Sequence, residues 1–523
     1  MTTPAARATT LAYVDAVHRR FREPVQPEGF TPDWDDRPLP HTHHPDAVRI
    51  ALPFPAVTTA PPGPAPAVAG GRNLTALAED LRATAGVLAR RCQIDWNRDL
   101  AEQSAPHAPR WGRGASSGGG TYPLEVYWAA GPSGPVPPGV YHYASGLHAL
   151  ERLTAGDPTA TVRAALGPDA IGHDQFLLCT VRPWKNAFKY HNLAYHLATL
   201  DLGSFLASWE LTSRDRGVGH RPRLRFDEDA LNALLGLDPD AESVHAVVPL
   251  DWRAADGAPA RTAVPPPAVR PAHHERSRTV RKFEAVDAVR RATAQNPGTA
   301  PAAEAAEAAA PAPGGSPADR MPLPAAATAP AVGAGRATLA ARTSSSGRID
   351  ASRPLGASAL AAVLAAAFPR PPAASGGFVE AAVVVRAAEG LPAGGYAYVP
   401  APHALEHLPG DPLSVLDRDL YGLDNYDVAG VPVVLVLHWH PERAVTAHGA
   451  RAYRSANAEA GAAAQRAHLA ATALGLASGI VFGIDPVPLD EALGLTAAGR
   501  RSQLCVFLGL PRPGAAALDG RLV

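Results

Sequence analysis

The stretch GVYHYASGLHALERL, from Gly139 to Leu153, decides the fold because it occurs twice. The second copy, GGYAYVPAPHALEHL, runs from Gly394 to Leu408, 255 residues further along the chain. Aligned without gaps, the two copies share both tyrosines, the His-Ala-Leu-Glu run and the final leucine. This repetition predicts that one chain contains two copies of one fold.

The similarity extends to both sides of this stretch. Upstream, LEVYWAA (Leu124 to Ala130) and VEAAVVVRAA (Val379 to Ala388) each predict a strand. Downstream, LAYHLATLDLG (Leu193 to Gly203) matches RAYRSANAEAG (Arg451 to Gly461), and each opens a long helix that we expect to be buried. The order helix, strand, strand, long helix, strand in each half indicates an α+β fold with a mainly antiparallel sheet. Two such halves predict an internal pseudo-dimer, compatible with a monomeric protein.

A shift in composition separates the two halves. Residues 292–335 contain 31 Ala, Pro or Gly among 44 residues and no aromatic residue. Such a segment buries too little apolar surface to offset its ordering entropy, so we interpret it as a flexible linker. The predicted organisation is an N-terminal extension (1–70), a first domain (71–291), this linker, and a second domain (336–523).

Bulk composition excludes several classes of function. A net charge of −1 gives no electrostatic basis for binding nucleic acid or an anionic membrane. The longest apolar run is too short to span a bilayer, and the N-terminus lacks the apolar region of a signal peptide, so we expect a cytoplasmic protein. Three isolated cysteines predict neither a disulfide framework nor a Cys-rich metal site. The His-rich runs HTHH, HWH and HH lack partners at ligand spacing, so we predict no metal.

A Gly-rich loop precedes the first strand of the first half. The sequence RWGRGASSGGGTYPLEVY runs from Arg110 to Tyr127 and contains three consecutive glycines beside two serines. Glycines allow positive φ and let the backbone approach a ligand closely. A mobile turn would explain the same glycines, so the loop alone does not define a site.

The loop and the repeated stretch together resemble a known family. ASSGGGTYPLEVY followed by GVYHYASGLHALERL is similar to the SagB-type (McbC-like) dehydrogenases of the nitroreductase superfamily. PDWDDRPLPHTHHPDAVRIALP (Pro32 to Pro53) and FKYHNLAYHLATLDLG (Phe188 to Gly203) resemble other segments of that family. The resemblance implies two tandem nitroreductase-like domains, as in the long dehydrogenases of thiopeptide-type pathways. It also implies FMN as the cofactor, bound across the interface between two such domains.

The resemblance divides one flavin site between the two halves. RTSSSGRIDASRPL (Arg342 to Leu355) resembles the segment that holds the phosphate, and the helix that follows offers free N–H groups to an anion. GLASGIVFGID (Gly475 to Asp485) is similar to a turn beside the flavin, whereas the first half supplies the loop over the ring. The second half has only a degraded loop, with Phe378 where the first half has Pro123, so we expect one complete site. The cofactor-binding residues implied are Arg113, Ser117, Gly118, Gly119, Arg342, Ser344, Arg348, Gly479, Gly483 and Arg500.

Lysine is rare in this chain, and two of its three lysines lie close together. Only Lys185, Lys189 and Lys282 occur among 48 basic residues, and Lys189 is followed by Tyr190. In the family that the chain resembles, a Lys-Tyr pair at this place is associated with dehydrogenation. An ammonium group favours a neighbouring phenolate, and desolvation favours a neutral amine, so either residue could take up a proton. We predict that Lys189 and Tyr190 are catalytic and leave open which is the base.

The resemblance implies a specific reaction. An azoline dehydrogenase oxidises thiazoline or oxazoline rings of a ribosomally made peptide to thiazole or oxazole, and oxygen reoxidises the flavin. It acts on an azoline-containing precursor peptide and cooperates with the cyclodehydratase that forms the azolines. Two alternatives stay open: a flavin-dependent reductase that uses NAD(P)H on a dehydroalanine, nitro or quinone substrate, and a flavin-less scaffold of a peptide-modifying complex.

Overall fold

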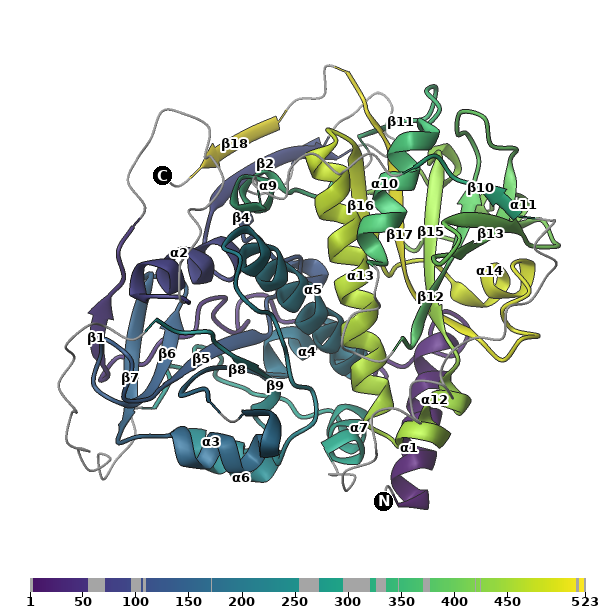
Figure 1. Cartoon of the computed structure of the whole chain (residues 1–523). Coiled ribbons are helices and arrows are strands. Elements are labelled where there is room, and N and C mark those ends of the chain that lie inside the picture. Colours follow the sequence, from purple (N-terminus) through teal and green to yellow (C-terminus); the bar gives the residue numbers. More distant parts are fainter. Residues whose placement is uncertain are drawn as a thin grey trace.

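The computed structural model shows two similar sheets on either side of a pair of central helices (Figure 1). The described residues are 3–54, 71–95, 105–106, 110–170, 172–253, 272–294, 320–325, 335–346, 348–369, 377–418, 420–423, 425–513 and 517–521. Among them, no helix has the length and apolar character needed to cross a lipid bilayer.

The first half forms an antiparallel sheet in the order β1-β7-β6-β5-β8-β9. Its strands are β1 (Val48–Ala51), β5 (Leu124–Ala130), β6 (Gly139–Ala144), β7 (Ala149–Ala155), β8 (Gln175–Val181) and β9 (Ser243–Pro249). Strand β8 and the edge strand β9 are buried along their whole length. Helices cover both faces, which explains why the strands are almost continuously apolar rather than alternating.

The second half repeats the same strand order. Its sheet runs β10-β14-β13-β12-β15-β17-β11, and β16 pairs with β17. The strands are β10 (Arg320–Pro322), β11 (Ile349–Asp350), β12 (Val379–Val385), β13 (Gly394–Val399), β14 (Ala404–His407), β15 (Val433–Trp439), β16 (Ala477–Val481) and β17 (Arg501–Pro511). The run β14-β13-β12-β15 corresponds to β7-β6-β5-β8, so the repeated sequence folds into a repeated structure. This agrees with the predicted α+β duplication.

The repeated stretch forms the same hairpin in both halves. In β6–β7 the Tyr143 hydroxyl is hydrogen-bonded to Nδ1 of His148 at 2.9 Å, and in β13–β14 the Tyr398 hydroxyl is hydrogen-bonded to Nδ1 of His403 at 2.8 Å. Both histidines have positive φ, 47° and 52°. A left-handed backbone is unfavourable for a residue with a side chain, and the hydrogen bond to tyrosine offsets that cost. The tyrosine and histidine that the two copies of the repeat share therefore stabilise a turn rather than form a ligand site.

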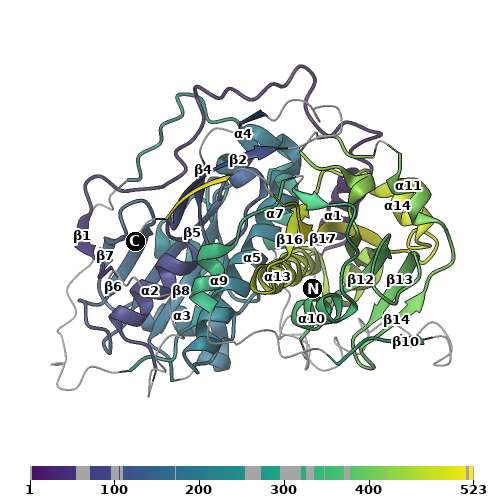
Figure 2. The same cartoon turned by 90° about the horizontal axis from the view of Figure 1, so that it is seen from above.

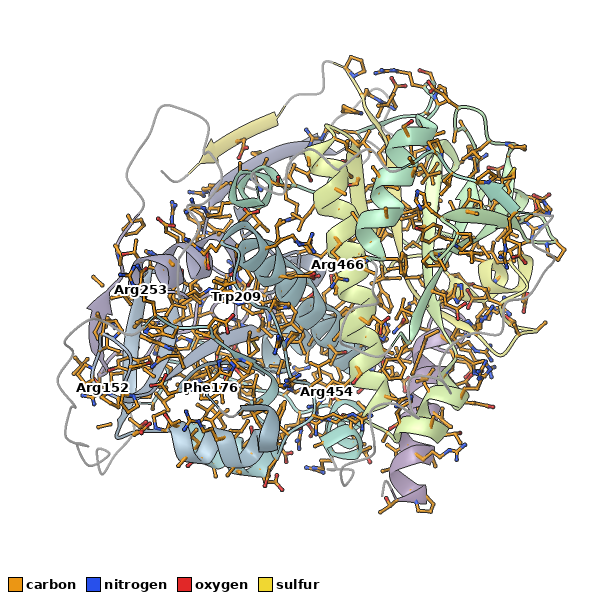
Figure 3. The ribbon with its side chains drawn as sticks, viewed as in Figure 1. Arg152, Phe176, Trp209, Arg253, Arg454 and Arg466 are labelled. Carbon is orange, nitrogen blue, oxygen red and sulfur yellow. The ribbon has the colours of Figure 1, made fainter. Side chains whose placement is uncertain are left out.

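Two long helices join the halves. Helix α5 (Ala194–Asp215) and helix α13 (Ala452–Ala473) lie side by side between the sheets (Figures 1 and 2). The rings of Tyr195 and Tyr453, equivalent residues of the repeat, stack with their centroids 6.3 Å apart. Arg466 on α13 pairs with Glu210 on α5 at 2.7 Å (Figure 3). The halves thus form an internal pseudo-dimer.

The chain ends exchange between the halves. Helix α1 (Pro4–His18), at the N-terminus, packs on the second half, where His18 lies 2.9 Å from Asp490. At the other end, β18 (Ala517–Arg521) pairs with β2 (Ala89–Asp95) of the first half, in a small sheet with β3 (Ala105–Pro106) and β4 (Arg110–Gly112). Each terminus therefore ties one half to the other.

The predicted linker lies only partly within the described residues. Helix α7 (Glu284–Ala294) extends three residues into it, and β10 pairs with β14 on the edge of the second sheet. The other residues between 295 and 334, apart from 323–325, lie outside the described residues.

Candidate active site

The Gly-rich loop is held on the central helix α5 by one carboxylate. The Ser117 hydroxyl donates to one oxygen of Asp201 at 2.5 Å, and the Gly118 N–H donates to the other oxygen at 2.9 Å. The N–H of Tyr122 in turn donates to the Ser117 oxygen at 2.8 Å. The loop from Ser117 to Tyr122 is therefore fixed relative to α5 just before β5 begins.

Asp201 is buried, and the described residues place no basic side chain at hydrogen-bond distance from it. Burial raises the pKa of Asp201 to about 7, whereas the hydrogen bonds from Ser117 and Gly118 act in the opposite direction. Sequence analysis did not select this residue, because one carboxylate in an apolar helix forms no recognisable motif.

The Lys-Tyr pair lies against the tip of the loop. Helix α4 (Trp184–Tyr190) carries both residues at its C-terminal end, and both side chains are partly exposed. Lys189 Nζ lies 4.7 Å from the centre of the Tyr190 ring. A Cβ atom on Gly119 would lie 2.2 Å from the Tyr190 hydroxyl and 2.8 Å from Lys189 Nζ. The structure therefore brings together three residues predicted from the sequence.

A buried ion pair fixes helix α4. Lys185, only 3% exposed, places Nζ 2.7 Å from Glu125 on β5. Burial lowers the pKa of Lys185. Burial alone would raise the pKa of Glu125, but Lys185, His142 and Arg182 together hold it well below its usual range. One lysine thus anchors the helix that presents the other.

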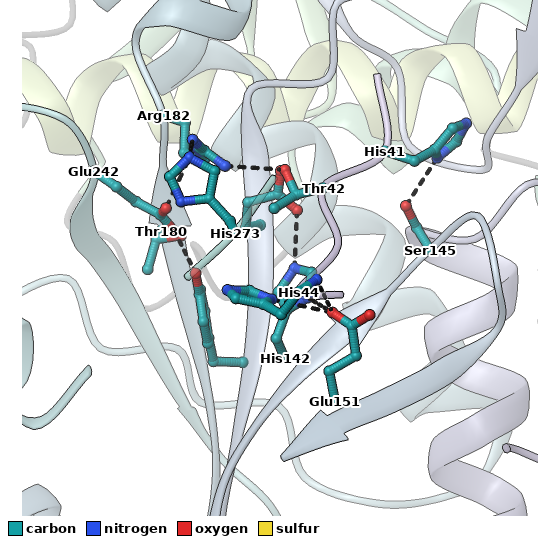
Figure 4. Close-up of polar contacts among 12 residues, drawn as sticks. His41, Thr42, His44, His142, Ser145, Glu151, Thr180, Arg182, Glu242 and His273 are labelled. Carbon is teal, nitrogen blue, oxygen red and sulfur yellow. Dashed lines mark hydrogen bonds and ion pairs between the residues drawn. The ribbon is translucent and has the colours of Figure 1, made fainter. Parts of the chain in front are cut away.

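Glu125 also belongs to a buried polar network beneath the N-terminal extension, of which Figure 4 labels His44, His142 and Glu151. His142 lies between Glu125 and Glu151, at 3.3 and 3.1 Å, and these hydrogen bonds raise its pKa against the effect of burial. Nδ1 of the His44 ring lies 3.1 Å from the Glu151 carboxylate, and the backbone N–H of His44 donates to the same carboxylate at 2.9 Å. The network holds the segment around His44 on the first sheet.

Within the described residues, His44, His142 and Glu151 form one group close enough to share a metal ion. The Glu151 carboxylate also accepts from Arg49 at 3.2 Å. Its oxygens are already hydrogen-bonded to nitrogen donors, and the nearby cations disfavour a further positive charge. We therefore infer no metal site from this group.

Arg342 of the second half contacts the first part of the same loop. Its guanidinium donates to the carbonyl oxygen of Gly114 at 2.8 Å and to that of Arg113 at 2.9 Å, and it lies 3.4 Å from His468. Burial lowers the pKa of Arg342 to about 10. In the described part of the chain no carboxylate pairs with this buried cation. The segment that resembles a phosphate-binding segment, which begins at Arg342, and the Gly-rich loop therefore meet across the two halves.

Other predicted residues lie near this junction with different roles. Arg113 is buried, donates to the Pro40 carbonyl at 2.8 Å and has no described hydrogen-bond partner for Nε. Ser344 is exposed, whereas the neighbouring Ser345 exchanges hydrogen bonds with Ser478. Arg348 donates through Nε to the carbonyl of Ser345 at 3.1 Å. Ser345, which the sequence pattern did not select, is the serine that orders this segment.

The remaining predicted residues do not reach the loop. A Cβ on Gly479 would lie 2.0 Å from the Tyr426 hydroxyl, so this face of Gly479 packs on the second-half core. Gly483 packs against Tyr421 in the same half. Arg500 pairs with Glu380 at 3.1 Å. Helix α10 (Ala357–Ala367), expected to bind phosphate at its start, is preceded by Leu355, whose N–H and C=O bond to Ala387 and Glu389.

The position of Arg500 follows from strand β17. Ser478, which bonds to the Arg342 segment, pairs with Leu508, whereas Arg501 pairs with Trp439 at the far end of β17. Leu508 is seven residue steps along the extended strand from Arg501, which is about 23 Å. Arg500 therefore lies beside the second-half counterpart of the loop, not beside Arg342.

That counterpart is anchored in the same way as the loop. Glu459 on α13 is the repeat equivalent of Asp201, and it accepts the N–H groups of Phe378 and Val379 at 3.0 and 3.2 Å. The second half carries neither the three glycines nor the Lys-Tyr pair at the corresponding places. The site is therefore asymmetric.

These features define an α+β protein with two tandem halves that share one polar junction. Residues 339–510 match the model of the Nitroreductase family. A crystal structure of a "putative nitroreductase" from Anabaena variabilis covers 96% of this chain and 99% of that chain, with 21% identity and a TM-score of 0.72. This similarity gives the chain a nitroreductase-like fold over nearly its whole length, including the first half, which the family model does not match.

Two other solved structures resemble only part of the chain. The McbBCD microcin synthetase complex of E. coli, with truncated pro-MccB17 bound, covers 32% of this chain and 68% of that chain, with 25% identity and a TM-score of 0.30. A nitroreductase with bound FMN from Bacteroides fragilis covers 36% and 92%, with 17% identity and a TM-score of 0.23. TM-scores this low support no inference about this chain. No curated protein matches it.

Proposed function

We propose that this protein is an FMN-dependent oxidoreductase that oxidises thiazoline or oxazoline rings in a ribosomally made peptide to thiazole or oxazole. One observation carries the proposal: a single loop contacts the buried Arg342 at its start, Arg113–Gly114, and the Lys189–Tyr190 pair at Gly119. The segment from Arg113 to Gly119 spans at most about 20 Å when extended. It links a cationic end, suited to phosphate, to an end with proton-accepting side chains.

The residues at this junction fit a flavin mononucleotide. Buried Arg342 has no described carboxylate partner, and the buried Nε of Arg113 has no described partner, so this junction carries positive charge that suits an anion. A Cβ on Gly120 would meet no atom within 4 Å, so this side of the loop is open. We propose that Arg342 and the adjacent serines hold the phosphate and that Ser117, Gly118 and Gly119 lie over the ring system.

The proposed reaction divides between the cofactor and the protein. When bound, FMN would supply the chemistry of accepting a hydride equivalent from the azoline ring. The protein must take up the proton released from the α-carbon of that ring. Lys189 and Tyr190 lie in contact with the loop and partly exposed, so either could receive this proton while the other stabilises the resulting charge. Lys185 and Glu125 would hold helix α4 in place.

The test begins with the visible spectrum and the flavin content of the purified protein. We expect bound FMN at about one per chain, because the second half lacks an equivalent loop. Incubation with an azoline-containing peptide and oxygen should remove two hydrogen atoms per ring, measured by mass spectrometry. Lys189→Ala and Tyr190→Phe should keep the flavin and lose most of this conversion. A protein that stays colourless after FMN is added would refute the proposal.

A second candidate function is a flavin reductase, which the match of residues 339–510 to the Nitroreductase family favours. The same purified protein distinguishes the two. Rapid bleaching of the flavin by NADPH, without azole formation, would assign the reductase. Slow bleaching with azole formation would assign the dehydrogenase. In that case the substrate must come from a cyclodehydratase, which we propose as the partner activity.

A further inference from the structure

We infer that Asp201 is a positioning residue that holds the Gly-rich loop, Ser117 to Tyr122, in its working place on helix α5. This inference deepens the proposed function, because it assigns the loop's alignment against Lys189 and Tyr190 to a residue that touches neither. Its basis is geometric. The carboxylate uses one oxygen for the Ser117 hydroxyl and the other for the Gly118 N–H.

The loop needs such an anchor because one of its residues has an unfavourable backbone conformation. Gly119 and Gly120 have positive φ, at 61° and 68°, which glycine adopts freely, but Tyr122 also has positive φ, at 48°. A conformation of this kind persists only when the surrounding contacts determine it. Ser117 is the centre of those contacts, since its C=O accepts from Gly120 and its hydroxyl oxygen accepts from Tyr122. Asp201 fixes the orientation of that serine.

The internal repeat supplies independent support. Glu459 occupies the equivalent position on α13 and accepts two successive N–H groups, those of Phe378 and Val379, from the counterpart of the loop. A carboxylate at this position of the long helix therefore anchors the segment before the second-sheet strand as well. The first half combines this contact with the three glycines and the Lys-Tyr pair, which the second half lacks.

The surroundings of Asp201 explain why the contact is specific. The carboxylate is 7% exposed and packs in a largely apolar helix, with Leu197 one turn away beneath Gly118. Lys189 reaches Gly119 rather than Asp201, and Gln465 of α13 bonds to Ser116. A buried carboxylate without a cation is costly unless hydrogen bonds satisfy it. In this protein the hydrogen bonds from Ser117 and Gly118 of the loop satisfy the Asp201 carboxylate.

The experiment compares Asp201→Asn with Glu459→Gln by amide hydrogen exchange on the full-length protein without added flavin. Asp201→Asn keeps the size of the side chain but replaces one acceptor with a donor. Exchange at Gly118 to Tyr122 should become faster by about tenfold or more, whereas exchange at Phe378 and Val379 should not change. Glu459→Gln should give the reverse pattern. Ser117→Ala, which removes the other side of the contact, should reproduce the first pattern if Asp201→Asn folds poorly.

Unchanged exchange at Gly118 to Tyr122 in Asp201→Asn, or an equal increase at both sites, would overturn the inference. A second readout separates positioning from general stability. With the azoline peptide, Asp201→Asn should lower kcat by about tenfold with little change in KM, while Glu459→Gln keeps both. If no flavin binds to the wild-type protein, the proposed function fails, and the exchange experiment still decides whether Asp201 holds the loop.

Discussion

Gly203 and Gly461 each lie where the backbone of the opposite central helix passes. A Cβ on Gly203 would be 1.9 Å from the carbonyl oxygen of Ala458, and a Cβ on Gly461 would be 1.9 Å from that of Leu200. Both glycines stand at the same position of the repeat. The two halves therefore contact each other through a symmetric pair of glycines, and the distance between α5 and α13 depends on the absence of side chains there.

We predict that Gly203→Ala and Gly461→Ala each destabilise the protein by about 3 kcal/mol, because the methyl group forces the two helices apart. Urea unfolding followed by circular dichroism measures the change. The matched control is Gly356→Ala, where a Cβ would meet only the flexible side chain of Glu389, at 3.6 Å. That variant should cost less than about 1 kcal/mol. Equal losses in all three variants would contradict the close approach of the helices.

A second pair of glycines tests the loop. We expect Gly119→Ala to abolish most azoline oxidation, because its Cβ would overlap the Tyr190 hydroxyl at 2.2 Å. Gly120→Ala has nearly the same positive φ but no atom within 4 Å, so it should show only the backbone cost of about 1–2 kcal/mol. Comparing FMN affinity and turnover of the two variants isolates the contact with Tyr190. If Gly120→Ala is as damaging as Gly119→Ala, the contact is not responsible.

Substitution of each of the three lysines should affect stability and turnover differently. Lys185→Met leaves Glu125 buried without its nearest cation and should lower the free energy of unfolding by about 3–5 kcal/mol. Lys189→Met should abolish turnover, because it removes one of the two proposed catalytic side chains. It should lower the free energy of unfolding by less than about 1 kcal/mol, because that side chain is partly exposed. Lys282→Met, at an exposed position, should change neither. Thermal unfolding and turnover of the three variants provide the comparison, and a stable but inactive Lys185→Met would oppose the assigned roles.

Sequence reasoning reached the duplication because the repeat preserves Tyr143, His148 and their equivalents, which fix a local turn. It also brought together the loop and the Lys-Tyr pair, because a resemblance joins segments that the fold then places side by side. It did not find Asp201, although Asp201 and Glu459 are aligned in the long-helix repeat. A lone acid in a helix has no spacing signal, and only the packing of the loop on α5 reveals its partner. Arg500 was selected although the length of β17 puts it at the opposite end of the sheet.

The pH dependence of stability tests the environment of Asp201. Its pKa is about 7 in the folded protein, compared with about 3.9 for an unfolded chain, so between these values the folded state binds a proton that the unfolded state does not. The resulting stabilisation is fully present below pH ~4 and disappears as the pH rises through about 7. The difference in unfolding free energy between wild type and Asp201→Asn should therefore fall by up to about 4 kcal/mol over this range.

Urea titrations at a series of pH values measure that difference. Ser117→Ala is a control that tests in which direction the pH of the transition moves. The Ser117 hydroxyl lowers the pKa of Asp201, so its removal should move the transition to higher pH. We expect a higher transition pH in Ser117→Ala than in the wild type, because burial is the main cause of the raised pKa and the lost hydrogen bond no longer stabilises the charged carboxylate. A difference between wild type and Asp201→Asn that stays constant with pH would mean that the pKa of Asp201 is not raised in the folded protein, and it would contradict desolvation as the main influence on this carboxylate.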